Sequence, residues 1–391
     1  MSLNECNTIP FNKPYLTGNE SKYITQSLLS LKLSGDGSFT DKCHEWLEEQ
    51  TKTNKALLTH SCTAALEMAA ILLDVKEDDE IIMPSYTFVS TANAFVLRGG
   101  VPIFVDVRSD TLNIDENLIE SAITSKTKAI VVVHYAGVAC EMDFIMTLAR
   151  KYNIRVIEDA AQGVLSSYKG KALGSIGDLG CYSFHDTKNI ISGEGGCLLV
   201  NDPLLIAKAE MIREKGTDRS QFIRGEVDKY TWRNIGSSYL PSESIAAFLW
   251  AQLEHAQEIV KNRLTLWQNY HQLFEPLELL GIVQRPYVPD GCQHNGHIYY
   301  LNLDESISRS FVLEQLKKMG ITCTFHYVPL HQSPAGTKYT KVCGSMAVTE
   351  KFGVRLIRLP LWVEMTEDMQ EYIFQSIQSI LTVKNVPFKE V

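Results

Sequence analysis

The chain has 391 residues, more than one compact core usually holds, so we expect two domains. Its formal net charge of −9 argues against nucleic acid as a partner, because nucleic-acid binding depends on a basic surface. The nine cysteines are scattered without a CxxC pair, so they indicate neither a metal site nor a redox pair, and we expect reduced thiols. With no signal peptide in residues 1–10 and no long apolar run, we expect a cytoplasmic protein without a membrane partner.

The first half of the chain alternates short β-rich runs with helical patterns. We predict strands at residues 56–59, 80–83, 102–105, 129–133 and 155–157. We predict helices at residues 64–73, 91–97, 114–124 and 143–152. This alternation indicates an α/β fold with a mostly parallel central sheet and helices on both of its faces.

The second half is less regular. Residues 213–233 form a polar stretch that is too long for an ordinary connection, which makes it either functional or mobile. A helical segment follows from 242 to about 274. The remainder mixes predicted strands (298–303, 322–327) with predicted helices (309–319, 366–382). We therefore expect a large α/β domain over residues 1–250 and a smaller C-terminal α+β domain over residues 251–391.

Asp159 is a candidate for cofactor binding, since ligands of parallel sheets lie at the carboxyl ends of the strands. It follows the apolar strand 155–157 and precedes two alanines. A buried carboxylate needs a cationic partner, and the protonated ring nitrogen of pyridoxal phosphate is such a partner. Alternatively, Asp159 caps the next helix.

Lys188 stands in a segment that is rich in glycine on both sides, which permits tight turns and a close approach of the backbone to a ligand. The flanking glycines are Gly170, Gly174, Gly177, Gly180, Gly193, Gly195 and Gly196. A catalytic lysine must lie near its ligand and have a lowered pKa. Alternatively, Lys188 is an ordinary lysine of a surface loop.

A phosphate site and a stacking site are indicated near two further strand ends. The run 61–63, Ser-Cys-Thr, lies between a strand and a helix, where free N–H groups and the helix dipole attract phosphate. The hydroxyls of Thr63 and Ser183 could add to such a site. Phe88 follows another strand and could stack on a flat cofactor. The alternatives are a plain helix cap for 61–63 and a core position for Phe88.

The order of these elements along the chain is more specific than any one of them. A phosphate turn, an aromatic residue, a strand-end aspartate and a glycine-flanked lysine follow one another as in fold-type-I pyridoxal-phosphate enzymes. Over nearly its whole length the sequence resembles the DegT/StrS-type nucleotide-sugar aminotransferases. The matching stretches are residues 9–11, 84–91, 158–162, 183–189, 193–196, 326–331 and 359–361.

This resemblance implies fold type I and assigns roles to the candidates. Lys188 is implied to carry pyridoxal phosphate as a Schiff base and to move the proton, and Asp159 to hold the ring nitrogen. Gln162 is implied to bond the ring hydroxyl, and Phe88 to stack on the ring. The implied phosphate contacts are Cys62, Thr63 and Ser183, together with Ser238.

Ser238 stands where many relatives place an Asn that reaches the cofactor of the neighbouring subunit, so the resemblance implies a homodimer with active sites at the subunit interface. Tyr327 and His331 lie in a matching stretch, and we place them near the sugar. Alternatively, the histidines of that stretch only bond backbone groups. Arg219 is the candidate for a nucleotide phosphate, because a guanidinium matches phosphate oxygens, or it is a solvated surface arginine.

The substrate is indicated only by resemblance. Residues 214–217, 219–222 and 227–232 look like the branch of the family that aminates dTDP-4-keto-6-deoxyglucose with L-glutamate to the galacto product. Three alternatives stay open: amination at C3, the gluco epimer at C4, and a cofactor-bound regulator without turnover. Relatives with His in place of the lysine are dehydratases, so the presence of Lys188 favours transamination.

Overall fold

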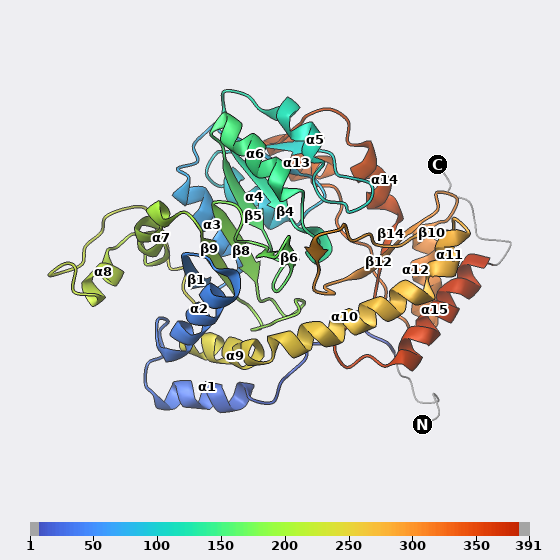
Figure 1. Ribbon diagram of the computed structural model, residues 1–391, viewed down its shortest axis with the longest axis horizontal. Helices are drawn as coiled ribbons and strands as arrows, with labels where there is room; N and C mark the ends of the chain where they lie inside the picture. Colours follow the sequence, from blue (N-terminus) through green and yellow to red (C-terminus); the bar gives the residue numbers. More distant parts are fainter. Residues whose placement is uncertain (1–7, 383–391) are drawn as a thin grey trace.

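An eight-stranded sheet forms the centre of the protein in the computed structural model, which describes residues 8–382 (Figure 1). The predicted absence of a signal peptide therefore falls largely on residues outside this range. Strand β9 pairs antiparallel with both of its neighbours, and all other neighbouring strands of this sheet are parallel. The strand order is β1 (Lys55–Thr59), β9 (Gly196–Val200), β8 (Leu179–Ser183), β5 (Arg155–Asp159), β4 (Thr127–Val133), β2 (Glu80–Pro84), β3 (Val101–Val105) and β13 (Lys341–Val342).

Helices cover both faces of this sheet because its inner strands are apolar on both sides. In β4, Ile130 and Val132 pack into one hydrophobic cluster, whereas Ala129 and Val131 pack into another on the opposite face. The first cluster includes α2 (Ser38–Thr51), α6 (Met142–Tyr152) and α9 (Glu243–Glu254). The second includes α3 (Cys62–Leu72), α4 (Val89–Val96) and α7 (Ile206–Arg213). The predicted α/β architecture is thus confirmed.

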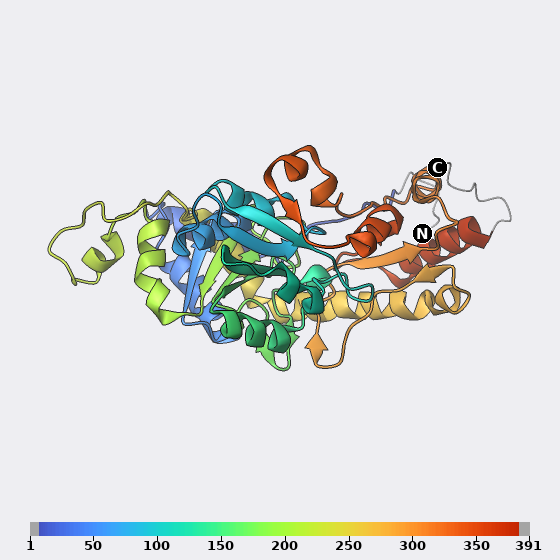
Figure 2. The same cartoon turned by 90° about the horizontal axis from the view of Figure 1, so that it is seen from above.

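A smaller antiparallel sheet with its own hydrophobic cluster lies in the C-terminal part of the chain. Its strands are β10 (Val283–Gln284), β12 (Tyr299–Leu303) and β14 (Leu356–Leu359), and its helices include α12 (Arg309–Lys318) and α15 (Glu367–Thr382). The long helix α10 (Ala256–Leu273) runs between the two parts (Figures 1 and 2). Its Ile259 packs in a cluster of the large sheet and its Tyr270 in that of the small one.

The division at residue 250 stays a prediction, since the two parts share elements. Helix α10 contributes to both hydrophobic clusters, and β13, from the C-terminal part, pairs with β3 of the central sheet. The remaining α-helices and strands of the described residues are α1 (Glu20–Leu29), α5 (Glu116–Ile119), β6 (Ser167–Tyr168), β7 (Lys171–Ala172), α8 (Arg219–Ile223), α11 (Glu275–Leu279), β11 (Cys292–Gln293), α13 (Pro334–Tyr339) and α14 (Ala347–Arg355). Over residues 8–382, no helix combines the length and the apolar character needed to cross a bilayer.

The predicted strand at 322–327 is wrong. Only Thr324 is bridged to a strand, through Arg358, and the segment then runs as irregular backbone. The successive side chains of Phe325, His326 and Tyr327 all line one cavity. A regular strand would turn every second side chain to the opposite face, so the irregular backbone is what brings all three to the same place.

Two predicted helices differ from those observed. The single helix expected over 242–274 is broken at His255, whose backbone leaves the helical region (φ −109°, ψ 8°), so that α9 and α10 are separate. The helix expected over 114–124 is reduced to α5 and a short 3-10 turn. Ile114 is instead bridged to Val107, and Asp115 caps the helix by accepting from the N–H of Asn117 (3.0 Å).

Glu243 fastens α9 to the start of α2. Its carboxylate is buried and accepts from the backbone N–H groups of Gly37 (2.9 Å), Phe39 (3.0 Å) and Thr40 (3.2 Å), and from the Thr40 hydroxyl. These N–H groups belong to the first turn of α2 and the residue before it, where no helical acceptor exists. One carboxylate thus accepts hydrogen bonds from the free N–H groups at the start of α2, a helix that covers the central sheet.

We predict that Glu243→Ala lowers the free energy of unfolding by about 2–4 kcal/mol, because buried donors at the start of α2 lose their acceptor. Glu49→Ala is the matched control, because this glutamate is exposed on α2, and we expect it to change stability by less than about 0.5 kcal/mol. Urea unfolding followed by tryptophan fluorescence measures both. Equal stabilities of the two variants would contradict the role of Glu243.

Candidate active site

A cavity of about 470 Å³ lies where β1, β2, β5 and β8 of the central sheet end. These are the carboxyl ends of parallel strands, which is where α/β proteins of this kind bind ligands. The structure brings most of the predicted residues together on the wall of this cavity. They are Cys62, Thr63, Phe88, Asp159, Gln162, Ser183, Lys188 and Tyr327.

Lys188 lies in the loop that connects β8 to β9. The base of this loop is closed by two backbone bonds, from Phe184 N–H to the Gly195 carbonyl (2.8 Å) and from Asp186 N–H to the Gly193 carbonyl (2.9 Å). Gly193 has a φ of +79°, a conformation that glycine adopts without steric cost. Burial lowers the pKa of the Lys188 amine, whereas Cys62 and Asp159 oppose this shift. A partly buried amine with a lowered pKa is suited to nucleophilic and proton-transfer chemistry.

Asp159 is buried at the end of β5, with 5% of its surface exposed. Its carboxylate accepts from the Thr91 hydroxyl (2.6 Å) and from the Ala161 N–H (3.1 Å). Among residues 8–382, no Lys, Arg or His forms an ion pair with it. The alternative role as a helix cap is wrong, since residues 160–165 form turns and no helix begins there.

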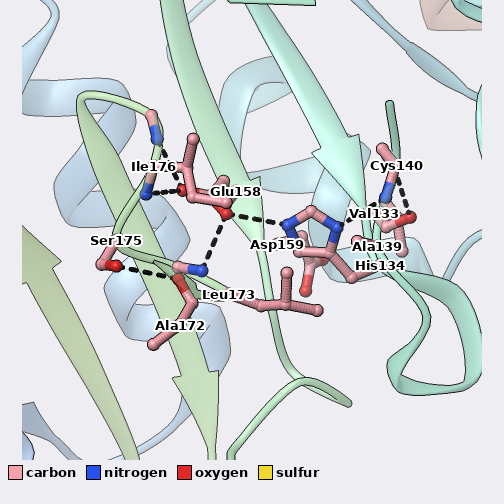
Figure 3. A network of polar contacts seen from close by, with 12 residues as sticks. Val133, His134, Ala139, Cys140, Glu158, Asp159, Ala172, Leu173, Ser175 and Ile176 are labelled. Carbon is pink, nitrogen blue, oxygen red and sulfur yellow. Dashed lines mark hydrogen bonds and ion pairs between the residues drawn. The ribbon is translucent and has the colours of Figure 1, made fainter. Parts of the chain in front are cut away.

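Glu158, the preceding residue, is held in a separate buried network (Figure 3). Its carboxylate accepts from the N–H groups of Gly174 (2.7 Å), Ile176 (2.6 Å) and Gly177 (2.6 Å), and contacts Nε2 of His134 (2.8 Å). Both side chains are fully buried. Because successive side chains of a strand point to opposite faces, this network anchors the end of β5 while leaving Asp159 directed into the cavity.

The N-terminus of α3 forms a cradle for an anion. Ser61 caps the helix by accepting from the Ala64 N–H (3.1 Å), and the backbone N–H groups of Cys62 and Thr63 have no acceptor within the described part of the chain. The Thr63 hydroxyl lies 2.7 Å from that of Ser90. A Cβ at Gly196 would lie 2.4 Å from the Cys62 nitrogen, so glycine is required where β9 passes this turn. These groups suit a phosphate.

Gln162, Tyr327 and Phe88 form another part of the wall. The Gln162 amide oxygen accepts from the Ala136 N–H (2.8 Å), and its nitrogen donates to the Tyr327 hydroxyl (2.9 Å). The ring centroid of Phe88 lies 6.5 Å from that of Tyr327. With 58% of its surface exposed, Phe88 is not a core residue, and its ring is available to cover a planar ligand.

Three predicted site residues are not brought to this cavity. His331 contacts Ser85 through Nδ1 (2.6 Å) and Glu350 through Nε2 (3.1 Å). These contacts agree with the alternative of a structural histidine, although its partners are side chains and the expected partners were backbone groups. Arg219 begins α8, which projects from the body of the protein, and its guanidinium pairs with Glu214 (2.9 Å) (Figure 1). Ser238 is exposed and bridged to Glu214. Their binding roles therefore stay predictions.

Sequence reasoning gave no role to several residues of the cavity, among them Thr91, His297 and Arg358. Thr91 closes the matching stretch 84–91, and its position at the end of that stretch is the signal that could have revealed it. Arg358 immediately precedes the matching stretch 359–361. His297 lies outside every matching stretch, and its Nδ1 contacts the Asn189 side-chain oxygen (2.9 Å), a long-range contact that no local pattern shows.

Pyridoxal phosphate fits this set of groups. The buried Asp159 carboxylate has no cationic partner among the residues that the structure describes, and the protonated pyridine nitrogen would supply one. The open N–H groups at the start of α3 would hold the phosphate, and Lys188 faces the same space. Phe88 offers an exposed ring for stacking.

Comparison with known proteins agrees with this chemistry. Residues 14–378 match the DegT/DnrJ/EryC1/StrS aminotransferase family. The chain is 31% identical to the GDP-perosamine synthase of Caulobacter vibrioides, with 94% of this chain and 97% of that protein covered. It is also 31% identical to the spore coat polysaccharide biosynthesis protein SpsC of Bacillus subtilis, over 95% of this chain and 97% of that protein.

The fold is shared with solved structures of aminotransferases. The aminotransferase from Psychrobacter cryohalolentis superposes with a TM-score of 0.89 at 26% identity, over 96% of this chain and 98% of that chain. The mostly parallel sheet, the smaller C-terminal sheet and the cavity at the strand ends are those of fold type I, as the sequence resemblance implied. The chain belongs to the DegT/DnrJ/EryC1/StrS family of pyridoxal-phosphate-dependent aminotransferases.

Proposed function

We propose that this protein transfers an amino group from L-glutamate to the keto carbon of a nucleotide-linked sugar. The observation that carries the proposal is the placement of Lys188 in one cavity with Asp159, a buried carboxylate that forms no ion pair within the described part of the chain. A relative that covers nearly the whole chain is named for the synthesis of a GDP-linked amino sugar, which supports a nucleotide sugar as the substrate class.

In the proposed reaction, each group of residues in the cavity has a separate role. Bound pyridoxal phosphate supplies an electron sink for the bond that loses its proton. Lys188 would take up the proton from the amino-acid carbon as a general base and, in the second half of the reaction, would return a proton to the sugar carbon as a general acid. The negative charge of Asp159 would keep the ring nitrogen of the cofactor protonated. The start of α3 would hold its phosphate.

The specific sugar proposed is dTDP-4-keto-6-deoxy-D-glucose, converted to dTDP-4-amino-4,6-dideoxy-D-galactose with formation of 2-oxoglutarate, as for cell-surface polysaccharides such as the common antigen. Its support is the sequence resemblance of residues 214–232 alone. The perosamine synthase relative favours a GDP-linked sugar as the second candidate. Amination at C3 and the gluco epimer at C4 are further alternatives.

A homodimer with shared active sites is part of the proposal. The segment 213–238, which carries Arg219 and Ser238, lies away from the cavity of its own chain. It exposes large apolar side chains, among them Trp232 with 78% of its surface exposed. Exposed aromatic groups on a projecting segment are typical of surfaces that are covered by a partner.

We predict that Lys188→Ala abolishes transamination, because no other amine replaces the proton carrier. The measurements are formation of 2-oxoglutarate and the absorbance of the Schiff base between the cofactor and the lysine, both of which should be lost. Lys171→Ala, an exposed lysine outside the cavity, is the control and should retain full activity. Retained turnover of Lys188→Ala would contradict the assignment.

We predict that Asp159→Asn lowers kcat by about 100-fold or more, because the neutral amide removes the charge that keeps the ring nitrogen protonated. Asp368→Asn, an exposed aspartate of α15, serves as the control. Steady-state kinetics of cofactor-saturated protein measure the effect. A near-normal rate would show that Asp159 is only structural.

The substrate is tested by NMR of the product after incubation with pyridoxal phosphate, L-glutamate and either dTDP-4-keto-6-deoxyglucose or its GDP-linked manno counterpart. We expect an axial amine at C4 of the dTDP sugar. An equatorial amine, an amine at C3 or turnover of the GDP sugar would contradict the specific sugar. Absence of any spectral change with glutamate would favour a cofactor-binding regulator over an enzyme.

A further inference from the structure

The carboxylate of Asp159 accepts fewer hydrogen bonds than two other buried carboxylates of the protein. An ionised carboxylate has room for about four such bonds. Glu158 and Glu243 each accept from three backbone N–H groups. Within residues 8–382, Asp159 accepts one bond from a backbone N–H, that of Ala161, and one from a side chain, that of Thr91. The Thr91 hydroxyl is therefore one of two donors that the described chain offers to this carboxylate.

The two donors bond different oxygens of the carboxylate. Thr91, in α4, donates to Oδ2 (2.6 Å), and Ala161, in the turn that follows β5, donates to Oδ1 (3.1 Å). One bond at each oxygen fixes the plane of the carboxylate. Hydrogen bonds to a charged acceptor are also stronger than those between neutral groups, and they stabilise the negative charge. The bond from Thr91 is the shorter of the two, and a substitution can remove it because its donor is a side chain.

The proton of the Thr91 hydroxyl is directed to Asp159, which decides the direction of a second bond. A hydroxyl has one proton, and an ionised carboxylate can only accept. The Thr87 hydroxyl lies 2.8 Å from that of Thr91, so the proton between these two oxygens comes from Thr87. Two buried hydroxyls thus form a chain in which both protons are directed toward Asp159. In such a chain each bond polarises the next and strengthens it.

The start of α4 holds both hydroxyls in place. Phe88 is the residue before the helix, and its carbonyl accepts from the backbone N–H of Thr91 (3.2 Å). Thr87 and Thr91 are four residues apart, which brings their side chains together across the first turn. The helix itself is fixed on the central sheet, since Ala94 and Phe95 are buried in the hydrophobic cluster on that face. The position of the Thr91 hydroxyl is therefore set by a packed helix.

We propose that Thr91 is a positioning residue of the active site. Its hydroxyl, supported by that of Thr87, keeps Asp159 ionised and correctly oriented, so that the ring nitrogen of bound pyridoxal phosphate stays protonated. The inference rests on the role proposed for Asp159, and it is independent of which sugar is the acceptor. Thr91 acts through Asp159 and needs no contact of its own with the substrate.

Thr349 provides a matched control for the loss of a hydroxyl. It is buried like Thr91, and its hydroxyl donates (2.7 Å) to Asp106, a carboxylate that is 5% exposed, as Asp159 is. Asp106 also accepts from the backbone N–H groups of Val348 (3.0 Å) and Thr349 (2.8 Å) at the start of α14. Neither Thr349 nor Asp106 lines the cavity. Thr349→Val therefore removes the same kind of bond, at the same depth, away from the cofactor.

The direct test is nitrogen-15 NMR of protein loaded with pyridoxal phosphate that is labelled at the ring nitrogen, because this signal reports whether the ring carries its proton. We expect the signal of Thr91→Val to move from the wild-type position toward that of Asp159→Asn. Thr91→Ser keeps the hydroxyl and should stay near the wild-type position. A wild-type signal in Thr91→Val, or an equal shift in Thr349→Val, would overturn the inference. An unshifted signal in Asp159→Asn would contradict the role proposed for Asp159, and the inference with it.

Steady-state kinetics with two cofactors give a second readout. With pyridoxal phosphate, we expect kcat to fall about 10-fold in Thr91→Val, the effect of one lost hydrogen bond to a charged group, and to change little in Thr91→Ser. A cofactor methylated at the ring nitrogen carries a permanent positive charge, so the ratio of wild-type to Thr91→Val kcat should then fall to about one. A ratio that stays near 10 would overturn the inference. Thermal unfolding and the amount of bound cofactor verify that each variant is folded and loaded.

Discussion

The buried carboxylate of Asp159 is the constraint on which the site depends, since a charge with 5% of its surface exposed must be balanced. Within residues 8–382, this carboxylate accepts hydrogen bonds from Thr91 and Ala161 but forms no ion pair with a cation. It anchors the end of β5 through the neighbouring Glu158, which is surrounded by three N–H donors and His134. The protonated ring nitrogen of bound pyridoxal phosphate would supply the opposite charge at the end of β5.

Both sheets contribute to the cavity, which explains why the C-terminal part must be held firmly against the large sheet. Helix α10 packs into the hydrophobic clusters of both parts, and β13 extends the central sheet. The C-terminal part places the Tyr327 hydroxyl next to the Gln162 amide. It also brings Arg358 to the wall of the cavity.

The fold and most of the residues that line the cavity were predictable from the sequence, because both depend on local patterns. The alternation of apolar runs with helical patterns predicted the strands of the central sheet. The order of Thr63, Phe88, Asp159 and Lys188 along the chain predicted residues that line the cavity. Contacts between distant segments were not predictable. The segment 322–327 was expected to be a strand because its residues favour β structure, but three successive side chains turn into the cavity. The placement of Arg358 on the wall of the cavity is likewise a property of the packed structure alone.

The most direct test of the account is to identify the residue that holds the cofactor. Protein loaded with pyridoxal phosphate is reduced with borohydride, which fixes the cofactor to its lysine, and is then digested and analysed by mass spectrometry. The account predicts one modified peptide, with the added mass on Lys188. Modification of another lysine, or no modified peptide from a protein that has bound the cofactor, would contradict it.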